Sequence, residues 1–152
     1  MVAGNTVDGA CLEEVRRKAE QLGVADRLKC VGRIPHGELA SVFSGAKVSV
    51  LPSLSETFGM PLVESMACGT PVAASRIAAF EEVVGEAGVL FDPCDVEGMK
   101  TTLLRLLTDE GLRGELRRKG LERAGVFSQE RFVGETLSVI EEALAETGSF
   151  RR

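Results

Sequence analysis

The feature that most constrains the fold is an alternation of short apolar runs with helical patterns. Four runs, at residues 28–31, 48–51, 71–74 and 88–91, are rich in β-branched and other apolar side chains. Such runs predict strands that are covered on both faces, as in a parallel sheet. Strand, loop and helix then repeat with short connections, which is typical of α/β folds with right-handed crossovers. We therefore predict a doubly wound, Rossmann-like parallel sheet.

The segments between and after these runs have helical character. Helices are predicted over residues 11–22, 38–44, 61–68 and 80–84. After Asp95 the pattern is wholly helical, and Ser128 is a candidate N-cap for a last helix that extends to Ala145. A chain of 152 residues has the size of one domain, so a single domain over residues 1–152 with a helical carboxyl end is expected.

Charge and hydropathy exclude several function classes. The 18 Lys and Arg residues against 23 Asp and Glu give a net charge of -5, which does not favour nucleic acid as a partner. No apolar run approaches the ~20 residues that a transmembrane segment needs. The first ten residues lack the pattern of a signal peptide, so a cytoplasmic location is expected.

Cysteine and glycine patterns exclude further sites. The four cysteines form no C-x-x-C pair and His36 is the single histidine, so neither a zinc site nor a thioredoxin-type motif is predicted. We expect reduced, mostly buried thiols. The G-x-G-x-x-G fingerprint is absent, and Ala10 and Cys11 stand where a P-loop needs Lys and Ser or Thr. Without a G-x-S-x-G elbow, a Ser/His/Asp hydrolase is not favoured, and we expect His36 to be a surface residue.

Two glutamates, Glu56 and Glu64, flank a glycine and a helix start in the segment ETFGMPLVE. Pro61 suits the first turn of a helix, where unpaired N–H groups and the dipole favour a phosphate. Gly59 allows a ligand to approach the backbone closely. Glu64 lies roughly 7.5 Å farther along the helix at 1.5 Å per residue, a separation that suits a ribose diol. Glu56, in the loop, could hold a sugar hydroxyl.

Spacing alone leaves a second interpretation open. In that interpretation Glu56 is a solvated loop residue, and Glu64 is an ordinary acidic residue in the first turn of a helix.

A longer stretch of sequence resembles a known family. The run PSLSETFGMPLVESMACGTPVAAS, with the flanks LKCVGRIPHGELASVFSGAKVSVLPS and AAFEEVVGEAGVLFDPCD, resembles the carboxyl half of the GT-B glycosyltransferases of group 1. These enzymes carry a Glu, seven residues, Glu motif in such a segment, and the half that contains it binds the nucleotide sugar. The resemblance covers nearly the whole chain.

The resemblance implies a role for each glutamate. Glu64 would bind the ribose hydroxyls, and Glu56 would lie against the donor sugar as the catalytic-site carboxylate. Backbone groups of the glycine segment would meet the sugar and the diphosphate, and the backbone after the strand at 28–31 would meet the base. The other residues implied in donor binding are Arg33, Ile34, Phe58, Gly59, Met60 and Leu62.

The implied reaction is transfer of a hexose from a nucleotide-diphosphate sugar, with retention at the anomeric carbon. The donor would be a UDP-, GDP- or ADP-sugar, which is a substrate and not a permanently bound cofactor. The family usually needs no bound metal, and the leaving diphosphate is stabilised electrostatically. A well-aimed hydrogen-bond donor contributes about 2.7 to 4 kcal/mol to such stabilisation.

The sequence departs from the family at its amino end. Residues 1–10 resemble the second strand of the domain and its following loop, so the first strand-helix unit and the amino-terminal acceptor domain are expected to be missing. Loss of the central first strand leaves sheet edges unpaired. We therefore expect either a fragment of a longer enzyme or a homo-oligomer that fills the gap, and an isolated chain that is inactive.

Two rival functions stay open at this point. The first is a catalytically inactive, truncated α/β binding or interaction module. The second is a sugar-nucleotide epimerase, for which the sequence supplies no clear acid and base pair beyond Glu56.

Two further expectations concern the helical carboxyl end. Its basic residues are expected to form a solvated helix face without function, and the last helix is expected to cover its own sheet. The basic residues are Arg113, Arg117, Arg118, Lys119 and Arg123.

Overall fold

The computed structural model describes residues 1–4 and 9–149, with side chains as far as Ala145. The chain forms two compact units, Met1–Ser41 and Val42–Arg152. Each unit is described by itself.

The first unit contains α1 (Gly9–Gln21) and a short 3₁₀ helix, η1 (Ala25–Arg27). The strand predicted at residues 28–31 is present only as an isolated parallel bridge between Val2 and Cys30. The prediction of a full strand there was wrong because a strand depends on a partner ladder. The described partner, residues 1–4, is too short to supply one, and most of the loop expected after it, residues 5–8, lies outside the described residues.

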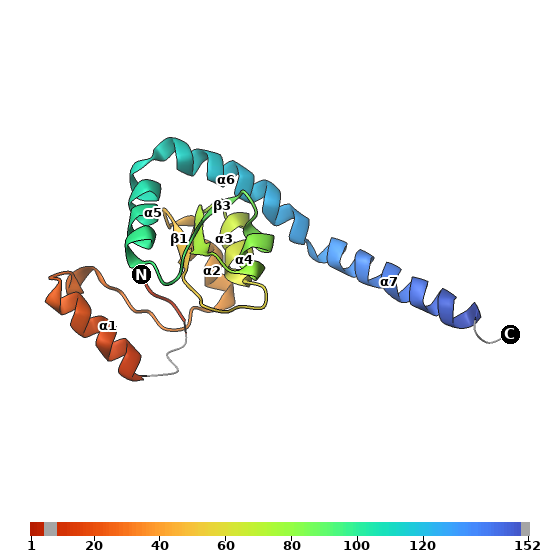
Figure 1. Ribbon diagram of the computed structural model, residues 1–152, viewed down its shortest axis with the longest axis horizontal. Coiled ribbons are helices and arrows are strands. Elements are labelled where there is room, and N and C mark those ends of the chain that lie inside the picture. Colours follow the sequence, from red (N-terminus) through yellow and green to blue (C-terminus); the bar gives the residue numbers. More distant parts are fainter. Residues whose placement is uncertain (5–8, 150–152) are drawn as a thin grey trace. The chain divides into compact units, whose positions relative to one another are not determined.

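The second unit is built on a three-stranded parallel sheet in the order β1-β2-β3 (Figure 1). The strands are β1 (Ser49–Leu51), β2 (Val72–Ser75) and β3 (Gly88–Phe91). Two helices connect them, α3 (Met60–Ala67) and α4 (Ala78–Val84), which confirms the predicted strand, loop, helix repeat. Before β1, α2 (His36–Ser44) begins in the first unit and ends in the second.

Both faces of the sheet are covered, as predicted for its apolar strands. The side chains of β2 alternate, so that Val72 and Ala74 belong to one hydrophobic core and Ala73 to the other. The first core is completed mainly by Leu62, Val63, Met66, Phe80, Val83 and Val84 of α3 and α4. The second is completed by Phe91 and by Leu106 and Leu116 of α5 (Val96–Thr108) and α6 (Glu110–Ala124).

Two basic residues of α6 hold the ends of other helices. Arg113 donates to the carbonyl oxygens of Leu106 and Leu107 at 2.8 and 2.9 Å, in the last turn of α5. Arg123 donates from Nε to the carbonyl oxygen of Val83 at 3.0 Å, at the end of α4. A cation is favourable at a helix carboxyl end, where carbonyl groups lack partners. The expectation of a merely solvated basic face was therefore wrong for these two residues.

Other charged residues of α6 do lie at the surface. Lys119 bonds to Glu115 one turn earlier at 2.9 Å, and Arg118 bonds to Glu122 at 2.9 Å. The hydrogen bond between Lys119 and Glu115 raises the pKa of the lysine and lowers the pKa of the glutamate. Exposed pairs of this kind contribute little to stability.

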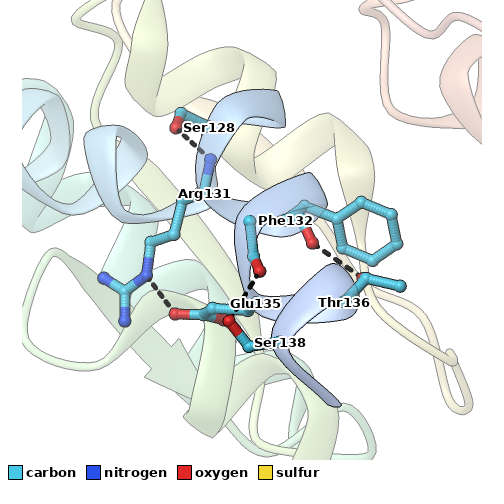
Figure 2. A network of polar contacts seen from close by, with 7 residues as sticks. Ser128, Arg131, Phe132, Glu135, Thr136 and Ser138 are labelled. Carbon is cyan, nitrogen blue, oxygen red and sulfur yellow. Dashed lines mark hydrogen bonds and ion pairs between the residues drawn. The ribbon is translucent and has the colours of Figure 1, made fainter. Parts of the chain in front are cut away.

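The last helix, α7 (Gln129–Ser149), begins after a short 3₁₀ turn, η2 (Gly125–Phe127). Ser128 caps it as predicted, because its hydroxyl oxygen accepts from the backbone N–H of Arg131 at 3.2 Å (Figure 2). Along the helix, Arg131 bonds to Glu135 at 2.7 Å, and the hydroxyl of Thr136 donates to the carbonyl oxygen of Phe132. These interactions are all local.

The prediction that the last helix covers its own sheet was wrong. Every side chain described in residues 129–145 is exposed, including Phe132 at 70% and Leu144 at 65%. Since helices α3 to α6 already fill the two faces of this short sheet, no face is left for α7.

The thiols are also less buried than predicted. All four are free, with Cys11 and Cys94 exposed and Cys30 and Cys68 partly buried. Cys11 lies in the first turn of α1, where Ala19 is the buried residue of the helix, and Cys94 lies in the turn before α5.

Within residues 1–4 and 9–149, none of the helices combines the length and the apolar character that crossing a bilayer requires.

A matched pair of glycine substitutions tests the packing of the sheet. A Cβ atom on Gly88 would lie 2.5 Å from Val72 Cγ2 and 2.8 Å from the Val72 carbonyl oxygen, whereas a Cβ atom on Gly114 of α6 meets nothing within 4 Å. Gly88→Ala should lower the free energy of unfolding by about 1–3 kcal/mol through overpacking. Gly114→Ala should raise it by about 0.5–1 kcal/mol because alanine favours the helix. Urea denaturation measures both, and equal effects would contradict the assigned register.

Candidate functional site

The candidate site is formed by the loop that follows β1 and by the start of α3. The loop begins at Pro52, directly after Leu51 ends the strand, and it ends at Gly59, the N-cap of α3. The carboxyl ends of parallel strands share one edge of a sheet, and ligands of open α/β sheets bind at that edge. The segment that holds both glutamates is therefore in the position that such folds use for ligands.

Gly59 has a backbone conformation that few other residues adopt. Its φ and ψ angles are 98° and 49°, in the left-handed region, and its carbonyl oxygen accepts from the N–H of Leu62 at 2.9 Å. A Cβ atom here would lie 2.6 Å from Cε1 of Phe80, which is fully buried. Glycine is thus required both by the turn and by the core beneath it. The approach of a ligand to this backbone remains a prediction.

The amino end of α3 carries no side-chain cap. Gly59 has no side chain to accept from the first N–H groups, and a proline stands in the first turn. Unpaired N–H groups and the positive end of the helix dipole favour an anion at such a position. The local sequence therefore leaves the start of the helix without the carboxylate or hydroxyl that caps α5, α6 and α7.

The two glutamates differ in their surroundings. Glu56 is exposed in the loop, whereas Glu64 is half-buried on α3 between the buried residues Val63 and Ser65. The helix geometry separates Glu64 from the N-cap by roughly 7.5 Å along the axis. Both carboxylates belong to one contiguous segment, with the start of the helix between them.

The other predicted residues of this segment divide into exposed and buried. Phe58 is 36% exposed and Met60 is 56% exposed, so both present atoms to solvent at the start of the helix. Leu62 is fully buried in the core, so a contact with a ligand would come from its backbone and not from its side chain.

Arg33 and Ile34 lie in the first unit, in the segment that leads to α2. Arg33 is exposed and Ile34 is half-buried. The structure thus gathers six of the eight predicted residues on the segment from Glu56 to Glu64, and it places these two in the other unit.

Sequence reasoning missed the aromatic residues that pack against the segment. Phe80 of α4 lies under Gly59, and Phe127 of η2 meets the ring of Phe58 edge to face, with the ring centroids 5.5 Å apart. The hydrophobic character of both residues was visible, but their contacts join segments far apart in the chain. No local pattern identifies such partners.

Across the described residues, no group of three or more His, Cys, Asp or Glu side chains gathers closely enough to hold a metal ion.

The contact between Gly59 and Phe80 generates a prediction for stability. Gly59→Ala should lower the free energy of unfolding by about 2–6 kcal/mol, because both the left-handed backbone and the contact with Phe80 become strained. The double variant with Phe80→Leu should be less destabilised than the sum of the two single variants, since leucine opens space for the new methyl group. Chemical denaturation of all four proteins measures the coupling. Strict additivity would show that the ring does not restrict residue 59.

Comparison with known proteins identifies the family. The family model described as glycosyl transferases group 1 matches residues 1–123. The D-inositol 3-phosphate glycosyltransferase of Acidothermus cellulolyticus is 40% identical over 136 residues, which cover 88% of this chain and 30% of that protein. The chain thus spans about a third of the length of such relatives.

Solved structures agree with this result. Sucrose-phosphate synthase from Thermosynechococcus elongatus superposes with a TM-score of 0.82 at 31% identity, over 94% of this chain and 37% of that chain. An Anabaena protein, HepE, solved in complex with UDP and glucose, superposes with a TM-score of 0.77 at 23% identity, over 95% of this chain and 39% of that chain, and shows the same fold.

These matches confirm the resemblance that the glutamate motif and its flanks indicated, and they confirm the α/β, Rossmann-like class of the fold. The chain belongs to the group 1 glycosyltransferase family and has the fold of one half of a GT-B enzyme.

Proposed function

We propose that this chain is the donor-binding half of a retaining glycosyltransferase, which transfers a hexose from a nucleotide-diphosphate sugar to an acceptor. One observation carries the proposal. Glu56 and Glu64 flank an uncapped helix start at the carboxyl edge of a parallel sheet, within a chain of the group 1 family.

The diphosphate of the donor would lie at the start of α3. Backbone N–H groups of Phe58, Gly59 and Met60 are the donors in this proposal, and the exposure of Met60 leaves the helix start accessible. The helix dipole adds to their effect on a negative charge. Because charge grows on the diphosphate as the sugar leaves, the same groups would favour the transition state more than the bound donor.

Each glutamate would bind a different part of the donor. Glu64, farther along α3, would accept hydrogen bonds from the two ribose hydroxyls, which suit the two oxygens of one carboxylate. Glu56, in the exposed loop, would hold a hydroxyl of the hexose beside the reacting carbon. The donor is a UDP-, GDP- or ADP-sugar, and the neighbour solved with UDP and glucose supports this class of substrate.

We also propose that both compact units belong to one nucleotide-sugar-binding domain over residues 1–152. The match of a single family model to residues 1–123 supports this, because it spans the boundary at residue 41. Contact of the base with Arg33 and Ile34 is part of the proposal and follows from the family resemblance.

The sheet supports a proposal about the partners of this domain. Among the described residues β1 pairs only with β2, so one of its edges is open. An open edge favours pairing with a further strand. The proposed partners are an acceptor-binding half in a complete cytoplasmic enzyme, or a second copy that pairs through this edge.

The division of labour between the glutamates can be tested by calorimetry. UDP, GDP, ADP and their glucose and mannose conjugates are titrated into the chain and its variants. Glu64→Gln should raise the Kd for a nucleotide and for its conjugate alike, about 10- to 150-fold, since charge-assisted hydrogen bonds are worth about 1.5–3 kcal/mol. Glu56→Gln should raise only the Kd for the conjugate, because the free nucleotide lacks the sugar.

Glu110→Gln serves as the control, since Glu110 is an exposed carboxylate at the start of α6. Its Kd values should equal those of the parent chain, and the unfolding midpoints of all variants should agree. Saturable binding that neither Glu64→Gln nor Glu56→Gln weakens would overturn the assignment of the site. Failure of every nucleotide to bind would instead favour an inactive interaction module.

A further inference from the structure

Three side chains from separate segments meet at the loop between β1 and α3. The ring of Phe127 in η2 lies edge to face with Phe58, at 5.5 Å and an interplanar angle of 83°. The guanidinium carbon of Arg123 in α6 lies 4.9 Å from the centroid of the same Phe127 ring. Phe127 thus contacts both a cation and the aromatic residue that directly precedes Gly59.

Arg123 is itself fixed from the other side. Its guanidinium donates to the carbonyl oxygens of Glu82 and Val83, in the last turn of α4. A planar guanidinium that makes two hydrogen bonds and also lies over a ring has little freedom to rotate. The position of Phe127 therefore depends on α4 and α6, two helices whose side chains line the cores of the sheet.

The loop has few other means of support. Residues 54–58 are all exposed, so they lack the buried contacts that hold a strand or a helix in place. The buried ring of Phe80 packs against Gly59, and the ring of Phe127 packs against the ring of Phe58. Edge-to-face aromatic pairs and cation–π contacts are directional, so they fix an orientation as well as a distance.

We propose that Phe127, oriented by Arg123, is a positioning residue that sets the place of Phe58 and Gly59 in the donor site. In this proposal Phe127 has no direct contact with the donor. It acts through Phe58, whose backbone continues into the start of α3 on one side and toward Glu56 on the other. The consequence for donor binding rests on the proposed function, whereas the effect on the loop does not.

The loop is tested without any ligand, by hydrogen exchange followed by mass spectrometry on the whole chain. Phe127→Ala should speed exchange about tenfold in peptides that cover residues 52–62, and leave peptides of β2 and β3 unchanged. Phe132→Ala is the matched control, because Phe132 is 70% exposed one turn into α7 and should change neither region. Unchanged exchange in the loop, or a uniform rise over the sheet, would overturn the proposal.

Two conservative variants separate orientation from simple packing. Phe127→Tyr keeps the ring and should behave like the parent chain. Phe127→Leu keeps apolar volume but has no ring face or edge, so it should resemble Phe127→Ala in the loop peptides. If leucine restores the exchange of the parent chain, Phe127 is only a packing residue and the positioning role is wrong.

Donor affinity is measured separately, with the UDP-, GDP- or ADP-sugar that binds the parent chain. Phe127→Ala should raise its Kd about five- to tenfold, and Phe132→Ala should leave it unchanged. An unchanged Kd beside faster loop exchange would overturn the link between this residue and the donor. If no nucleotide binds the parent chain, the proposed function fails, while the exchange experiment still decides whether Phe127 positions the loop.

Discussion

The pairing of β2 on both of its edges is the interaction on which the rest of the structure depends. All four residues of this strand are buried, and Val72, Ala73 and Ala74 alternate between the two cores. Small side chains such as Ala73 and Ala74 let helices approach both faces closely. Because β1 is parallel to β2, the carboxyl ends of both strands lie at one edge of the sheet. The loop with both glutamates begins at the carboxyl end of β1.

Much of this fold could be predicted from the sequence because the signals are local. The apolar run of β3 and the cap at Ser128 are each carried by residues that are neighbours in the chain, and both were predicted where they are observed. β3 also finds a complete ladder on β2. The strand at residues 28–31 depends on a distant partner, and it is reduced to a single bridge. Apolar pattern alone cannot tell whether a strand will find a ladder.

The same distinction applies to the site. The segment from Glu56 to Glu64 is contiguous, so the spacing of its glutamates together with the family resemblance was enough to single it out. What holds this segment in place comes from elsewhere: Phe80 and Phe127 reach it from α4 and η2. Arg113 and Arg123 of α6 are a second example of a role that local sequence does not reveal. They cap other helices through tertiary contacts, which helical spacing does not predict.

The length of α7 has a mechanical consequence for the turn that precedes it. A helix of 21 residues extends roughly 30 Å at 1.5 Å per residue, and it starts two residues after Phe127. A sideways displacement of a few ångströms at the far end therefore tilts the first turn by only a few degrees. The direction of α7 is therefore set at its start, where η2 and the cap at Ser128 join it to α6 beside the ring of Phe127.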